Sequence, residues 1–255
     1  MTFPHYQYTN IPLRALQGAD RTIYYSHAVQ ELEHCLNPFS FIQDPRINII
    51  SILDKRNNQG GTGILLNKYG FILTSFHLVN EFKQDRSSVH RYYIRDISDH
   101  FHRIDPSFFA YDPQHDLALI RALNIPSSTF SIPISTQPLH LSDMIRYIAF
   151  VDGIDITSHV GEIKSTSHNV HYPHKIILDA IAFSGQAQRG YSGAPLFNDQ
   201  NHIIGNLFGG GYLDESLREQ ENESDDEDEE VNFGTKGIYI EKLLQELIKN
   251  LHNTK

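Results

Sequence analysis

Residues 190–197 read Gly-Tyr-Ser-Gly-Ala-Pro-Leu-Phe, and this stretch constrains the fold more than any other. Ser192 stands between two glycines, and an apolar run typical of a buried strand follows it. Glycines let the backbone bend sharply and let a bound molecule approach the main chain. A serine on such a turn, with free backbone N–H groups beside it, has the arrangement of a nucleophile next to an oxyanion hole.

This motif is a weak signal by itself, because a Gly-x-Ser-Gly arises by chance in about a tenth of chains of this length. The sequence also supplies a base and an acid. His77 follows two short apolar runs, 61–66 and 71–76, whose polar, glycine-containing connection predicts a hairpin. Asp116 stands directly before another apolar run, 117–120. The order histidine, aspartate, serine is that of chymotrypsin and differs from that of subtilisin and the α/β-hydrolases.

These three residue types suit nucleophilic catalysis. A serine hydroxyl attacks poorly until a base takes its proton, and histidine is the side chain whose ordinary pKa lies close to neutrality. A carboxylate at Asp116 would orient the imidazole of His77 and stabilise it once protonated. Each residue also has a plain reading: His77 is one of 15 histidines, Asp116 can form a turn, and Ser192 can sit in a glycine turn. Their joint occurrence in this order favours a triad of His77, Asp116 and Ser192.

The motifs together resemble the trypsin-like serine proteases, most closely the HtrA/Deg protease domain. The similarity extends over roughly 47–247 and is carried by a Thr-x-x-His segment, an Asp-Leu-Ala-Leu segment, the serine motif, and a closing Gly-x-x-x-Ile strand with its helix. In this sequence they are Thr74–His77, Asp116–Leu119, Gly190–Leu196 and Gly234–Leu244. The resemblance implies a serine endopeptidase that acts on protein or peptide substrates through an acyl-enzyme on Ser192. It also implies that the backbone N–H groups of Gly190 and Ser192 form the oxyanion hole.

The resemblance implies an all-β fold of two packed six-stranded antiparallel barrels, with the catalytic residues at their junction. Short helices are expected on either side, the second from the helical spacing of its apolar residues. No PDZ domain is expected after the protease domain. The expected segments are an N-terminal extension at 1–46, which contains a short helix, and the protease domain at 47–255. Within the protease domain we expect barrel one at 47–125, barrel two at 132–240 and a C-terminal helix at 241–251.

Several residues depart from the family pattern. Relatives usually carry Asn-Pro before the serine motif, whereas residues 184–189 contain no proline, which predicts a looser loop or one ordered by substrate. Tyr191 and Ala194 replace the usual residues beside the serine. These departures keep open an alternative function, a protease-like binding or sensor module with a silent or conditionally assembled site.

The substrate pocket is predicted by position. Gln186 is expected near the base of the pocket for the residue before the cleaved bond, with Leu207, Phe208 and Gly209 along one wall. Phe208 could equally be a core residue. Because no acid occupies position 186, a preference for lysine or arginine is not expected, and a small or medium apolar residue is favoured.

Charge is concentrated in one segment. Residues 214–230 hold 11 acids and one base, which equals the net charge of −10 of the whole chain. Such a run cannot pack, so we expect a solvated, disordered acidic insertion on the surface. The remainder is close to neutral and has no basic patch for nucleic acid.

Other features predict few additional functions. His168, His171 and His174 recur at three-residue intervals, but Val170, Tyr172 and Pro173 favour a hairpin end, so neither a metal site nor a cofactor is expected. A single cysteine allows no internal disulfide. No hydrophobic leader or membrane-length apolar run is evident, so no membrane association is expected. These features favour a cytoplasmic location, with signal-independent export and the oligomeric state left open.

Overall fold

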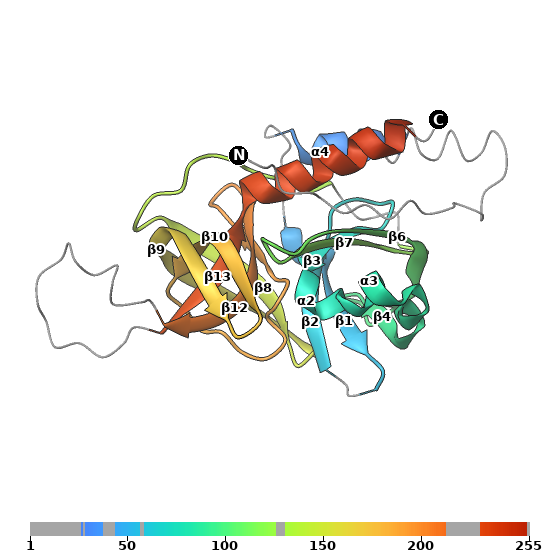
Figure 1. Ribbon diagram of the computed structural model, residues 1–255, viewed down its shortest axis with the longest axis horizontal. Helices are drawn as coiled ribbons and strands as arrows, with labels where there is room; N and C mark the ends of the chain where they lie inside the picture. Colours follow the sequence, from blue (N-terminus) through green and yellow to red (C-terminus); the bar gives the residue numbers. More distant parts are fainter. Residues whose placement is uncertain are drawn as a thin grey trace, which may run out of the picture.

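The computed structural model describes residues 27, 29–37, 44–56, 59–125, 131–212 and 230–253. The predicted acidic insertion therefore lies outside the described residues except for Glu230, as does most of the N-terminal extension. The described part is mainly β-structure arranged as two sheets, side by side in Figure 1. The predicted mostly-β, chymotrypsin-like architecture is confirmed. Within the described ranges, no helix is both long and apolar enough to cross a lipid bilayer.

The first sheet has seven antiparallel strands in the order β5-β4-β1-β2-β3-β7-β6, one more than the six expected. The two-residue strand β5 extends the sheet at its edge. The strands are β1 Ile49–Asp54, β2 Gln59–Leu65, β3 Phe71–Ser75, β4 Tyr92–Arg95, β5 Phe101–His102, β6 Ile104–Asp112 and β7 Leu117–Ala122.

The second sheet is the closed six-stranded barrel that was predicted. Its strands follow the cyclic order β10-β13-β12-β11-β8-β9, and their pairing is antiparallel throughout. The strands are β8 Met144–Val151, β9 Asp155–Tyr172, β10 Lys175–Phe183, β11 Pro195–Phe197, β12 Ile203–Tyr212 and β13 Glu230–Lys236. β9 is the longest of these strands at 18 residues, and it forms a hairpin with β10.

Helices occupy three places. The C-terminal helix α4, Gly237–Asn253, begins four residues earlier than predicted and runs across both sheets (Figure 1). Residues 29–35 are helical, within the region where an N-terminal helix was expected. Short helical segments precede or connect strands of the first sheet. η1 Pro45–Asn48 precedes β1, and α2 Phe76–Val79, α3 Glu81–Gln84 and η2 Arg86–Arg91 lie between β3 and β4.

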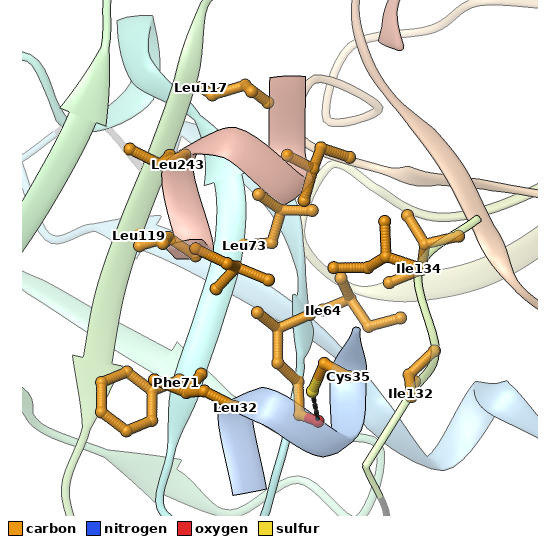
Figure 2. Packing of buried hydrophobic residues seen from close by; sticks show 14 of the residues in the cluster. Leu32, Cys35, Ile64, Phe71, Leu73, Leu117, Leu119, Ile132, Ile134 and Leu243 are labelled. Carbon is orange, nitrogen blue, oxygen red and sulfur yellow. Dashed lines mark hydrogen bonds between the residues drawn. The ribbon is translucent and has the colours of Figure 1, made fainter. Parts of the chain in front are cut away.

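A central hydrophobic cluster joins these parts. β3 is buried along its length, because Phe71 and Leu73 face this cluster while Ile72 faces the interior of the first sheet. α4 contributes Leu243 and Leu244 among others, and the helix 29–35 contributes Leu32. Figure 2 shows residues of the first sheet and of both helices meeting there with Ile132 and Ile134. The second barrel contributes Ile148, Phe150 and Phe197 to the same cluster. The interface between the sheets is thus a shared core.

Cys35 belongs to this cluster and is fully buried. Its thiol donates a hydrogen bond to the carbonyl of Leu66 at 3.3 Å, drawn as the dashed line in Figure 2. Burial raises the pKa of the Cys35 thiol from an ordinary value of 9.0 to about 12. The unfolded chain therefore loses the thiol proton at lower pH than the folded protein does.

This difference predicts an alkaline loss of stability. Because the folded pKa is the higher one, the contribution is fully present below about pH 9 and is lost as pH rises towards 12. Relative to Cys35→Ala, the free energy of unfolding of the wild type should fall by about 1.4 kcal/mol per pH unit in that window. Chemical denaturation of both proteins at several pH values measures this. Parallel pH curves for the two proteins would contradict it.

Candidate active site

Strands β3 and β7 bring His77 and Asp116 together. Ser75 pairs with Leu117, so the residues just beyond them lie at the same end of the first sheet. Nδ1 of His77 lies 2.6 Å from Oδ2 of Asp116, and the backbone N–H of His77 donates to Oδ1 at 3.0 Å. The His77 side chain is one-third exposed, whereas that of Asp116 is fully buried. The imidazole is thus oriented by a buried carboxylate and still reachable.

A second histidine–aspartate pair, His115 and Asp112, stabilises the turn that carries Asp116. Asp116 has φ of +53°, a left-handed conformation that aspartate tolerates better than most residues. Asp112 accepts the backbone N–H of Gln114 at 3.0 Å and lies 2.6 Å from Nδ1 of His115. The ring of His115 stacks on Tyr239 of α4 with centroids 3.6 Å apart. The C-terminal helix thereby supports the turn that presents Asp116.

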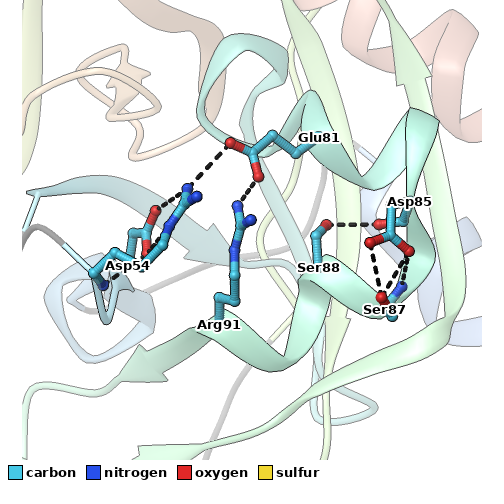
Figure 3. A network of polar contacts seen from close by, with 7 residues as sticks. Asp54, Glu81, Asp85, Ser87, Ser88 and Arg91 are labelled. Atoms are coloured by element: carbon cyan, nitrogen blue, oxygen red, sulfur yellow. Dashed lines mark hydrogen bonds and ion pairs between the residues drawn. The ribbon is translucent and has the colours of Figure 1, made fainter.

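Ion pairs hold the helical segments that follow His77 against β1. Arg56 contacts Asp54 of β1 at 2.9 Å and Glu81 of α3 at 3.1 Å, and Arg91 of η2 also pairs with Glu81. Asp85 accepts backbone and side-chain hydrogen bonds at the start of η2 (Figure 3). This network connects α3 and η2 to β1 next to the short helix α2 that carries His77.

Thr62 connects the first sheet to the loop carrying Ser192. Its backbone N–H donates to the carbonyl of Ser192 at 2.8 Å, and its hydroxyl donates to the carbonyl of Gly190 at 2.7 Å. The same hydroxyl accepts the N–H of Phe150 at 2.9 Å, while Thr74 donates to the Thr62 carbonyl at 2.7 Å. Two hydrogen bonds of Thr62 therefore hold this loop directly, and the other two connect Thr62 to β8 and β3.

The two glycines of the serine motif allow this close approach. Gly190 and Gly193 have φ of +99° and +88°, which side chains other than hydrogen rarely permit. A Cβ atom would lie 2.5 Å from the carbonyl oxygen of Phe150 at Gly190 and 2.0 Å from that of Thr62 at Gly193. These positions need glycine because neighbouring backbone occupies the space.

Further contacts hold the segment before Ser192. Asp152 donates its backbone N–H to the carbonyl of Arg189 at 3.3 Å. Since a trans peptide directs its N–H opposite to its carbonyl, the N–H of Gly190 points away from Asp152. The hydroxyl of buried Tyr191 lies 2.7 Å from Nε2 of His159 on β9. Hydrogen bonds from neighbouring segments therefore reach this loop in the structure, and the looser or substrate-ordered loop expected from the missing proline stays a prediction.

Ser192 itself makes a contact that the sequence did not predict. Its hydroxyl donates to the backbone carbonyl of Phe208 at 3.4 Å. No hydrogen bond joins His77 to Ser192 among the described residues. In the same part of the chain, the N–H groups of Gly190 and Ser192 have no acceptor and are available to a bound molecule.

The four residues predicted for the substrate pocket have different surroundings. Gln186 is exposed, and its carbonyl accepts a hydrogen bond from the hydroxyl of Tyr147 at 2.7 Å. The side chains of Leu207 and Phe208 are buried in two hydrophobic clusters of the second barrel. For Phe208 the structure therefore shows the core alternative. Gly209, the residue after Phe208, is half-buried.

Two residues near Asp116 were missed by the sequence analysis. Lys175, at the start of β10, places its ammonium 3.2 Å from Oδ1 of Asp116. Tyr172, at the end of β9, lies beneath Lys175, with the nitrogen 5.3 Å from the ring centroid. Burial and then the negative charge of Asp116 raise the pKa of Tyr172 to about 12. No local sequence signal marks either residue, because both reach Asp116 through the long β9–β10 hairpin.

The spaced histidines lie at the same hairpin. β9 contains His168 and His171, and His174 stands in the turn before β10. His168 stacks on Phe233 with ring centroids 5.3 Å apart. Within the described ranges, no group of three or more potential ligands could hold a metal ion.

The fold and the site define a class of protein. Two antiparallel sheets, with a histidine–aspartate pair on one and a glycine-flanked serine loop on the other, are the arrangement of chymotrypsin-like serine proteases. A family profile described as trypsin-like peptidase domain matches residues 61–205, more than half of the chain. The chain belongs to the trypsin-like peptidase family.

Comparison with individual proteins agrees with the HtrA resemblance. A probable periplasmic serine endoprotease, DegP-like, from Chlamydia muridarum is 27% identical over 181 residues, which cover 66% of this chain. The match spans about a third (34%) of that relative's length.

Solved structures share the fold. The Rv3671c protease of M. tuberculosis matches in its active form with a TM-score of 0.59 and 14% identity, covering 96% of this chain and 93% of the other. Its inactive form also matches with a TM-score of 0.59, at 15% identity and coverage of 79% and 89%. The fold likeness therefore does not distinguish an active from an inactive site.

The contacts of Thr62 predict the effect of a nearly isosteric replacement. Thr62→Val keeps the backbone bonds but leaves the buried groups of Phe150 and Gly190 without a partner, which should lower the free energy of unfolding by about 1 to 3 kcal/mol. Chemical denaturation measures this change. The control is Thr136→Val at an exposed position, expected to stay within about 0.5 kcal/mol. Equal effects of the two replacements would contradict the role given to Thr62.

Proposed function

We propose that the chain is a serine endopeptidase in which Ser192 is the nucleophile, His77 the general base and Asp116 the residue that orients the base. The His77–Asp116 contact of 2.6 Å is the observation that carries this proposal. With Nδ1 engaged by the carboxylate, Nε2 of His77 is the nitrogen left to take the proton of the Ser192 hydroxyl.

The remaining steps use the backbone of the Ser192 loop. Attack of Oγ on a peptide carbonyl creates a tetrahedral oxyanion, which the N–H groups of Gly190 and Ser192 would stabilise. The proton held by His77 then passes to the leaving amine, and an acyl-enzyme forms on Ser192. Water, activated by the same imidazole, releases the second product.

The edge of β12 supports an extended peptide as the substrate. β11 pairs with β12 only up to Asn206, and beyond Leu207 no described strand pairs with that edge. A β-bulge between Leu207 and Gly209 turns the carbonyl of Phe208 towards Ser192. Residues 209–211 are all glycine, so no side chains obstruct an added strand. The preference for a small or medium apolar residue before the cleaved bond stays a prediction.

A second candidate is a binding or sensor module with a silent or conditionally assembled site. It is favoured by one observation, the hydrogen bond from Ser192 to Phe208 in place of one to His77. In that case the free edge of β12 would hold a peptide without cleaving it.

Reaction with a fluorophosphonate distinguishes the two candidates. The wild type should be labelled at Ser192 and should digest a denatured protein, and Ser192→Ala should lose both activities. His77→Ala should lower the labelling rate by a factor on the order of 10⁴ or more, because the base is removed. Ser158→Ala, at an exposed serine on β9, is the matched control and should behave as the wild type.

A folded wild-type protein that resists labelling at neutral and mildly alkaline pH, and leaves denatured protein intact while binding it, would establish the binding module.

A further inference from the structure

The tip of the β9–β10 hairpin crosses from the second barrel to the first sheet. Tyr172 and Lys175 pair across this tip, and the Lys175 ammonium lies 3.2 Å from Oδ1 of Asp116. The lysine side chain is 37% exposed, whereas that of its partner is fully buried. An ion pair between two exposed groups contributes little to stability. The free energy of a buried carboxylate, in contrast, depends strongly on the charges beside it.

The contacts of Asp116 are divided between its two oxygens. Oδ1 receives Lys175 and the backbone N–H of His77, and Oδ2 lies 2.6 Å from Nδ1 of the His77 ring. Lys175 and the backbone therefore hold one oxygen and leave the other to the imidazole. This division fixes the carboxylate plane that orients the base.

The charge balance before reaction also depends on Lys175. A general base must be neutral at the start, so His77 does not then neutralise Asp116. Among the described residues, Lys175 is the one lysine or arginine within hydrogen-bonding distance of Asp116. Removing it would leave the buried carboxylate without a basic side chain beside it before the reaction.

Tyr172 restrains the lysine. Its ring lies 5.3 Å from the Lys175 nitrogen, in a cation–π contact. Its hydroxyl lies against Gly209, where a Cβ would be only 2.6 Å from that oxygen. The hairpin tip thus contacts both Asp116 and the strand whose carbonyl holds Ser192.

We propose that Lys175 is a positioning residue that holds the Asp116 carboxylate in its orientation towards His77, with Tyr172 restraining its ammonium. The proposal rests on the serine endopeptidase function proposed above, and it adds a residue from the opposite barrel to the support of the base.

The test compares three lysine variants by two measurements. Lys175→Met removes the charge, Lys175→Arg retains it, and Lys164→Met is the matched control, since Lys164 also lies on this hairpin but pairs with Glu162. One measurement is the rate of fluorophosphonate labelling of Ser192. The other is the downfield proton NMR signal of the hydrogen between His77 and Asp116, which requires no catalytic activity.

Lys175→Met should slow labelling by about tenfold or more, the effect of losing a hydrogen bond to a charged group. It should also move or broaden the downfield signal. Lys175→Arg should recover most of the rate and the signal, and Lys164→Met should match the wild type in both.

Wild-type rate and signal in Lys175→Met would overturn the proposal, as would equal effects of Lys175→Met and Lys164→Met. A wild type that is not labelled at all would refute the endopeptidase function, and the NMR signal alone would then decide the role of Lys175. An unshifted signal in Lys175→Met would count against it in that case.

Discussion

The hydrogen bonds of Thr62 are the constraint on which the site depends. They fix the carbonyls of Gly190 and Ser192 against the first sheet, although the serine loop belongs to the second barrel. The shared hydrophobic core brings the two sheets together, but apolar contacts are non-directional and cannot set the position of a loop to within an ångström. The directional bonds of one buried threonine supply that precision.

His77 and Asp116 are held by independent means. Pairing of β3 with β7 sets their separation, and Tyr239 of α4 supports the turn that carries Asp116 through the ring of His115. Lys175 adds a bridge from the opposite barrel. The His77–Asp116 pair is therefore formed at rest, while the hydroxyl of Ser192 is engaged elsewhere. Catalysis would require a rotation of that side chain rather than a rebuilding of the loop.

The sequence predicts those parts of the site that local pattern can encode. His77, Asp116 and Ser192 stand beside short apolar strands, and the order of the strands brings the first two together. Lys175 is separated from Asp116 by 59 positions, and no local spacing reveals a contact made by a long hairpin. The sequence indicates Thr62 only as one residue of a glycine-rich hairpin and does not predict its hydrogen bonds. Phe208 was ambiguous because an apolar residue suits both a pocket wall and a core.

In the proposed mechanism the Ser192 loop has its working conformation before a substrate binds. A crystal structure of the protein after reaction with a fluorophosphonate tests this. We expect the phosphonyl oxygen within hydrogen-bonding distance of the N–H groups of Gly190 and Ser192, with both bonds from Thr62 unchanged and the bond to Phe208 lost. An adduct in which the Thr62 bonds are broken and residues 188–192 are rearranged would contradict the claim.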